Sequence, residues 1–166
     1  MYITFDDYVG LYWTDRITPE AFTRIAIEAQ RIMDMYTTGI DSVKKLQVAF
    51  PTDECDAKTV KACACKIADL LFQMQTAEDN AMASRKYTQT ANGLQGGVIT
   101  SMSSGNESVS YGSSNSNTAV DKAASDPVER EKLLRDTVKQ YLSGITDANG
   151  VNLLYMGRYP VRIDHV

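Results

Sequence analysis

The sequence has very little of the residue types that most often carry out catalysis and bind metals. It contains one histidine, His165, in 166 residues. Histidine is the usual proton shuttle near neutral pH, so this scarcity argues against histidine-based catalysis. The three cysteines, Cys55, Cys63 and Cys65, form no CxxC pair, and an odd number does not close a disulfide framework. Cys63 and Cys65 would point about 200° apart on a helix, so we expect free thiols and no metal or cofactor.

Long apolar runs are also absent, and nothing approaches the roughly 20 residues that a membrane helix needs. The first residues include Asp6 and Asp7, where a signal peptide would be basic, and no apolar region follows them. We therefore expect a protein made in the cytoplasm that has no contact with a membrane.

The composition that remains is ordinary for a soluble globular protein. Hydrophobic residues make up 43% and charged residues 23%, with 17 basic and 21 acidic side chains and a net charge of −4. This predicts a single domain over residues 1–166 with one modest core. The acidic balance argues against a general DNA-binding surface but is compatible with a passage through which DNA slides.

Three segments carry the signals of a helix start. Thr18-Pro19-Glu20 predicts a helix to about Tyr36, Pro51-Thr52-Asp53-Glu54 predicts one to about Gln75 or beyond, and Asp126-Pro127-Val128-Glu129 predicts one ending near Gly144. Gly39 is expected to stop the first of these helices. The fold class is therefore mainly α, a small bundle of three to four helices.

Two of these helices have apolar residues outside their main core face. Ile27 and Met35 project among charged residues of the first helix, which makes them candidates for contact with another molecule. The second helix carries an additional apolar set that includes Cys65 and Phe72. This set indicates either a central core helix or a face that meets a neighbouring subunit.

The segment 88–118 has a different composition from the rest of the chain. Ser, Gly, Asn and Thr make up 21 of its 31 residues, and its single charge is Glu107. Such a segment does not build a core. Two β-prone runs within it, residues 98–102 and 107–111, predict an inserted hairpin, the alternative being a flexible low-complexity loop.

Residues 151–166 are expected to form an extended C-terminal tail. The tail carries Leu153, Leu154, Tyr155 and Tyr159 after a turn at residues 147–150. Apolar surface of this size usually docks, either on the chain's own domain or on a partner.

No motif with a catalytic mechanism is present. The sequence has no P-loop, no GxGxxG after a strand, no HExxH, no GxSxG and no Cys/His cluster. Asp6 and Asp7 fit a helix start, with Thr4 and Asp7 as a cap, better than a paired carboxylate site. We expect that the chain is not an enzyme.

Several short motifs follow one another in an order that spans nearly the whole chain. They are Met1-Tyr2-Ile3-Thr4 with Asp6, Asp7 and Tyr8; Ile17-Thr18-Pro19-Glu20-Ala21-Phe22-Thr23-Arg24; Met33-Asp34-Met35-Tyr36-Thr37-Thr38-Gly39; Ser108-Val109-Ser110-Tyr111; Tyr141-Leu142-Ser143-Gly144-Ile145-Thr146; and Gly150-Val151-Asn152-Leu153-Leu154-Tyr155-Met156-Gly157. Together they resemble the head-tail connector, or head completion adaptor, proteins of long-tailed bacteriophages and their prophages.

The resemblance implies a structural virion protein made in the bacterial host. Its partners would be the portal protein, copies of itself in a ring of about twelve subunits, a downstream neck, stopper or tail-completion protein, and DNA passing non-specifically through the lumen. The implied location is the virion neck. Candidate interface residues are Ile27, Met35, Cys65, Phe72, Val98, Ile99, Met102, Val109, Tyr111, Leu153, Leu154, Tyr155 and Tyr159.

Two other functions compete with this one. A DNA-binding packaging or regulatory module, similar to a small terminase subunit, would also use three helices of this size. The helix that begins at Pro127 argues against it, because four basic and four acidic residues balance along residues 126–139. A hydrolase with an unrecognised carboxylate site is the third hypothesis, and it requires two acids converging in a pocket.

Overall fold

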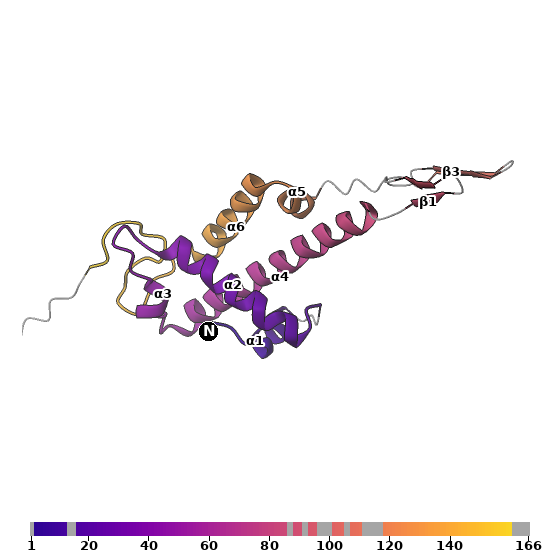
Figure 1. The fold of residues 1–166 in the computed structure, drawn as a ribbon. Coiled ribbons are helices and arrows are strands. Elements are labelled where there is room, and N and C mark those ends of the chain that lie inside the picture. The colour runs from indigo at the N-terminus through magenta and orange to yellow at the C-terminus, as the bar shows by residue number, and fades with distance from the viewer. Residues whose placement is uncertain are drawn as a thin grey trace, which may run out of the picture. The chain divides into compact units, whose positions relative to one another are not determined.

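The protein is mainly helical, which confirms the mainly α part of the predicted fold class. The computed structural model describes residues 2–12, 16–85, 88–90, 93–95, 101–104, 107–110 and 118–160. Six helices lie in these ranges: α1 (Phe5–Tyr12), α2 (Pro19–Thr37), α3 (Lys45–Val48), α4 (Glu54–Arg85), α5 (Ala119–Ser125) and α6 (Pro127–Leu142), as drawn in Figure 1.

The three predicted helix starts are confirmed by their caps. The Thr18 hydroxyl accepts from the Ala21 N–H at 3.4 Å at the start of α2. The Asp53 carboxylate accepts from two backbone N–H groups at the start of α4, and that of Asp126 accepts from Val128 N at the start of α6. Each side chain satisfies donors that a first helical turn leaves free, so these starts are encoded locally.

Three further helices raise the number above the three to four expected. Two of them begin with a reciprocal capping box, in which the side chains of a threonine and an aspartate bond each other's backbone N–H. Thr4 and Asp7 form this box at α1, as predicted, and Thr118 and Asp121 form it at α5. The third, α3, is a single turn of four residues.

Four short strands lie among the described residues of the Ser/Gly/Asn-rich segment. β1 (Thr88–Thr90) pairs antiparallel with β2 (Gly93–Gln95), and β3 (Ser101–Ser104) pairs antiparallel with β4 (Glu107–Ser110). The residues between and beyond these strands, among them 96–100 and 111–117, lie outside the described residues. Because the residues that connect and flank these strands are not described, the predicted inserted hairpin stays a prediction.

The chain divides into two compact units. Unit 1 comprises Met1–Phe72 with Glu131–Val166, and unit 2 comprises Gln73–Arg130. The composition predicts one core, and nearly all buried apolar side chains do belong to unit 1. In unit 2 the described apolar core is limited to Met74 and Ala123, and an ion pair joins Arg130 to Glu78.

The core of unit 1 surrounds the first half of α4. Tyr8 of α1 is fully buried, its ring lies 5.3 Å from that of Phe22, and its hydroxyl donates to Asp69 of α4 at 3.4 Å. Helix α1 thus covers the side of α4 that carries Cys65, and Lys61 pairs with Asp7 at 2.9 Å on the same side. The chain's own N-terminal helix occupies this side of α4. The alternative prediction, that a neighbouring subunit covers this side, is therefore wrong.

The C-terminal segment is folded onto unit 1 as far as Pro160, where the sequence predicts an extended tail. The turn after α6 forms as expected, with Gly150 at a φ of 77° and its N–H donating to Asp147 O at 2.9 Å. Thr146 and Asn152 form an isolated antiparallel bridge, and Leu153 is fully buried. Of the two alternatives for this segment, docking on the chain's own fold is therefore confirmed for residues 151–160.

The burial of the thiols gives a first testable prediction. Cys63 and Cys65 are fully buried on α4, whereas Cys55 is exposed in its first turn. We expect a thiol reagent to modify Cys55 rapidly in the native protein and to reach the other two only on unfolding, which mass spectrometry of the modified peptides would measure. The variant Cys55→Ser is the control and should show almost no fast reaction. Rapid modification of Cys63 or Cys65 in the native protein would contradict the packing of α1 against α4.

Candidate functional site

A buried lysine fastens the C-terminal loop, residues 151–160, to unit 1. The Lys45 side chain, from α3, is fully buried. Its Nζ donates to the carbonyl oxygen of Leu153 at 3.0 Å and to that of Tyr155, and lies 5.8 Å from the centre of the Tyr155 ring. Burial lowers the pKa of Lys45, while the nearby Asp147 and Asp41 carboxylates raise it. Two backbone carbonyls and an aromatic face thus replace the water that this ammonium group would otherwise bind.

Further hydrogen bonds hold the same loop in one conformation. The backbone N–H of Tyr159 donates to Asp41 at 2.5 Å, and the Tyr159 hydroxyl donates to the buried Asp147 at 2.5 Å. Burial and the Asp147 carboxylate raise the pKa of Tyr159 above its ordinary value. The loop is therefore fixed by side chains from α3, from the segment before it and from the turn after α6.

Two glycines allow the segment after α2 to approach this loop closely. A Cβ atom on Gly39 would overlap the carbonyl oxygen of Gly157, and one on Gly157 would overlap the Tyr155 ring. Next to Gly39, the backbone N–H of Ile40 donates to Met156 O at 3.0 Å. The expectation that Gly39 ends a helix is thereby corrected, since α2 ends at Thr37 and Gly39 serves a close contact of two backbones.

An apolar patch lies where the segment after α2 meets the C-terminal loop. We define this patch as Ile40, Tyr155 and Met156. Their exposed fractions are 78%, 50% and 56%. The backbone bond between Ile40 and Met156 places the residues next to one another. Large apolar side chains that are adjacent, exposed and held by a rigid backbone are typical of a surface that binds another protein.

The outer face of α2 also carries exposed apolar side chains, as the sequence predicts. Ile27 is 61% exposed and Met35 is 50% exposed. Between them on the helix, Arg31 forms a bidentate ion pair with Glu28, with distances of 3.0 and 2.6 Å. This face is mixed in character and less continuous than the apolar patch.

The remaining predicted interface residues differ in how far they are exposed, and some of them are not described. The prediction is wrong for Cys65 and Leu153, because both side chains are fully buried in unit 1 and have no surface to offer a partner. Phe72, Leu154 and Tyr159 are half-buried, and Tyr155 belongs to the apolar patch. Val98, Ile99 and Tyr111 lie outside the described residues, while Met102 and Val109 are opposite each other in the β3–β4 pair with side chains that are not described.

Sequence reasoning missed Ile40, Met156 and Lys45. Ile40 lies outside every predicted helix, and Met156 is one of several apolar residues in its segment. Lys45 is adjacent to Lys44, and nothing in the sequence distinguishes the buried lysine from the half-exposed one. Tertiary contacts determine where these residues lie, and the local sequence does not reveal them. The partners of Lys45, for example, lie more than 100 positions away along the chain.

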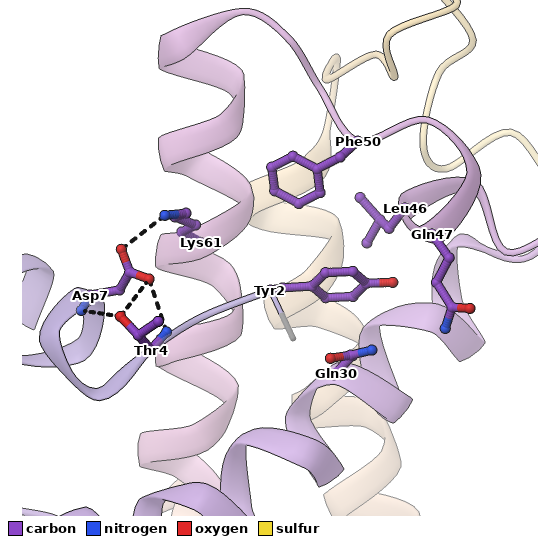
Figure 2. A pocket seen from close by; sticks show the side chains of 8 residues that line it. All are labelled: Tyr2, Thr4, Asp7, Gln30, Leu46, Gln47, Phe50 and Lys61. Atoms are coloured by element: carbon purple, nitrogen blue, oxygen red, sulfur yellow. Dashed lines mark hydrogen bonds and ion pairs between the residues drawn. The ribbon is translucent and has the colours of Figure 1, made fainter.

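A separate pocket of about 640 Å³ opens in unit 1 between the N-terminal segment, α2, α3 and α4. Figure 2 shows the side chains that line it: Tyr2, Thr4, Asp7, Gln30, Leu46, Gln47, Phe50 and Lys61. The hydroxyl of Tyr2 donates to the buried Asp34 carboxylate at 2.5 Å, and the Gln47 amide donates to its other oxygen at 2.5 Å. Burial and this carboxylate hold the pKa of Tyr2 well above its ordinary value.

The described residues contain no group of three or more His, Cys, Asp or Glu side chains arranged to hold a metal ion. Burial raises the pKa of Cys63 and of Cys65 to about 12, which disfavours the nucleophilic thiolate. Within the same ranges, no helix is long and apolar enough to cross a bilayer.

Comparison of the chain with models of protein families, with curated proteins and with solved structures finds no match.

Proposed function

We propose that the chain is a structural subunit of a bacteriophage neck, a head-tail connector that forms a ring on the portal and joins head to tail. DNA would pass through the lumen of the ring, and a downstream neck or tail-completion protein would bind its other side. In this proposal the protein resides in the virion, has no catalytic role, and uses residues 88–118 as an inserted hairpin that contacts a neighbour.

The observation that carries the proposal is the convergence of segments that resemble connector proteins. Tyr2, in the first motif, bonds Asp34 in the third. The N–H of Leu153, in the last motif, donates to Ile145 O, in the preceding one, at 3.0 Å. Ile40, directly after the third motif, bonds Met156 of the last. Five of the six motifs lie in unit 1, the exception being the motif at residues 108–111, and Tyr155 and Met156 of the apolar patch belong to the last of them.

The patch also provides what a docking protein needs. Its backbone is fixed by Lys45 and by the close approach of Gly39 to Gly157, so little conformational entropy is lost when a partner covers it. We therefore propose the patch as the surface that binds the portal or the next component of the neck.

Substitutions in the patch test this proposal. We expect Ile40→Asp and Met156→Asp each to weaken binding to the portal protein encoded with this chain by at least about tenfold, because a charge buried in an apolar contact is not compensated. Binding would be measured by co-sedimentation of the purified chain with assembled portal rings.

The matched control is Val128→Asp, which also adds an acid at an exposed apolar side chain, 71% exposed, in unit 2. This variant should bind as the unchanged protein does. Circular dichroism should show the same helical content for all three variants, since the replaced side chains are largely exposed. Equal binding by all three variants would contradict the assignment of the patch.

A further inference from the structure

The turn after α6 contains an asparagine that is followed by a glycine, Asn149-Gly150. This dipeptide is chemically labile in an open chain. Glycine has no side chain to keep its backbone nitrogen away from the asparagine amide, so the two groups react with each other when both are free to move. The docking function gives this dipeptide no role, and the hydrogen bonds around it determine whether the two groups meet.

The folded turn holds both of these groups. The backbone N–H of Gly150, whose nitrogen would attack, donates to Asp147 O at 2.9 Å. The side-chain amide nitrogen of Asn149, which would leave, donates to the Tyr159 hydroxyl at 2.8 Å. The backbone N–H of Asn149 donates to Asp147 Oδ1 at 2.9 Å. Asn149 is an exposed residue, yet its amide is directed to Tyr159 and is not free to rotate.

The Tyr159 hydroxyl connects this asparagine to the C-terminal loop. It accepts from Asn149 and donates its single hydrogen to the buried Asp147 carboxylate at 2.5 Å. The backbone N–H of Tyr159 donates to Asp41 at 2.5 Å, which anchors Tyr159 to the segment before α3. Asn149 is thus held by a residue ten positions further along the chain. The loop must open before the Asn149 side chain can turn toward the Gly150 nitrogen.

We propose that Asn149 is a deamidation site and that its contact with Tyr159 restrains the reaction. When the loop opens, the Gly150 nitrogen attacks the side-chain carbonyl carbon of Asn149 and gives up its proton to solvent. The bond between that carbon and the amide nitrogen breaks, and the nitrogen takes up a proton and leaves as ammonia. Water then opens the resulting cyclic imide at either carbonyl. The product is aspartate or isoaspartate at position 149, and water is the only other reactant consumed.

Deamidation would weaken the contact that restrains it. A carboxylate has no hydrogen to donate, and the Tyr159 hydroxyl already donates its single hydrogen to Asp147, so two carboxylates would compete for one donor. Their like charges would also repel each other. The product therefore favours opening of the loop that carries Tyr155 and Met156 of the apolar patch.

The test follows deamidation of the full chain at mildly alkaline pH by mass spectrometry of its proteolytic peptides. The native chain should react at Asn149 at least about tenfold more slowly than the same chain unfolded in urea, because the reaction requires the open loop. Peptide mapping separates this site from the second Asn-Gly pair at residues 92–93, of which Asn92 lies outside the described residues. Equal rates at Asn149 in the native and unfolded chain would overturn the proposal.

A substitution isolates the contact with Tyr159. Tyr159→Phe should raise the native rate at Asn149 about fivefold, because it keeps the ring but removes the hydroxyl that holds the amide. The matched control is Tyr36→Phe, which removes a hydroxyl that donates to Glu131 O at 3.3 Å elsewhere in unit 1. This variant should react at the unchanged rate. A native rate for Tyr159→Phe equal to that of the unchanged chain would also overturn the proposal.

A second pair of variants tests the effect of the product. Asn149→Asp should lower the urea midpoint, because it introduces the competing carboxylate. Asn152→Asp makes the same change nearby, but its side-chain oxygen still accepts from the Leu154 N–H, a bond of 2.8 Å, so its midpoint should change little. Equal midpoints for the two variants would contradict a restraint at Tyr159. None of these measurements involves a portal, so failure of this proposal would leave the docking function of the apolar patch untouched.

Discussion

Replacing Lys45 by methionine is expected to lower the free energy of unfolding by about 2–4 kcal/mol. The side chain is fully buried and donates to the carbonyl oxygens of Leu153 and Tyr155. Methionine has a similar length but no donor, so both carbonyls would lose their partner without regaining water. The loss should appear as a lower urea midpoint with an unchanged dependence on denaturant, because the surface exposed on unfolding stays the same.

The neighbouring residue provides the control for this prediction. Lys44 is 55% exposed, and its Nζ lies 4.0 Å from the Asp34 carboxylate. Asp34 is buried, but the ammonium group of Lys44 lies largely in solvent at the limit of ion-pair distance, so this pair contributes about 0–1 kcal/mol and Lys44→Met should change stability little. Equal effects of the two substitutions would contradict the claim that Lys45 fastens the C-terminal loop.

Raising the pH above 9 is expected to destabilise the fold strongly. Burial raises the pKa of Cys63 and Cys65 to about 12 from an ordinary value of 9.0. Between these values the unfolded chain loses the thiol protons while the folded chain keeps them. The folded state then binds more protons, so its stability falls as the pH rises, by about 2 kcal/mol per thiol near pH 10.5. Urea unfolding at a series of pH values measures this slope.

The double variant Cys63→Ala with Cys65→Ala isolates the contribution of the thiols. Its stability at pH 7 should be lower, because two side chains are removed from the core. Its decrease between pH 8 and pH 10.5 should be much shallower than that of the unchanged protein. Part of the slope will remain, because burial and the Asp69 carboxylate raise the pKa of Tyr8 to about 12. Identical slopes for the two proteins would contradict thiols buried in this environment.

The helix starts could be predicted from the sequence because their signals are local. A threonine or aspartate, a proline and a first-turn acid act within four residues, and Thr18, Asp53 and Asp126 all cap the helices that they predict. The apolar spacing on the first half of α4 also indicates correctly that this helix is central, since Val60, Cys63 and Ile67 are fully buried.

The sequence could not predict that helix α1 covers the side of α4 that carries Cys65, because this packing depends on contacts between residues far apart in the chain. The Tyr8 hydroxyl reaches Asp69, 61 positions further along the chain. Helix α1 has eight residues and two first-turn acids, so its pattern does not distinguish a core element from a short exposed turn. The sequence therefore makes Cys65 an interface candidate, although α1 buries its side chain.

The candidate docking site was predicted only in part for the same reason. The sequence indicates apolar side chains after the last helix, and Tyr155 is indeed exposed. Which of these side chains point inward depends on Lys45 and on the approach of Gly39 to Gly157, two long-range contacts. Leu153 is consequently core, whereas Ile40 joins the surface from a distant segment.

Assembly of the chain on a portal is tested most directly by electron microscopy of the two purified proteins together. Portal rings incubated with an excess of the chain should show an additional ring on the same axis, with the symmetry of the connector. At the same concentration, the Met156→Asp variant should decorate far fewer portal rings. Portal rings that remain bare at saturating concentrations of the unchanged, folded chain would contradict a role as a connector.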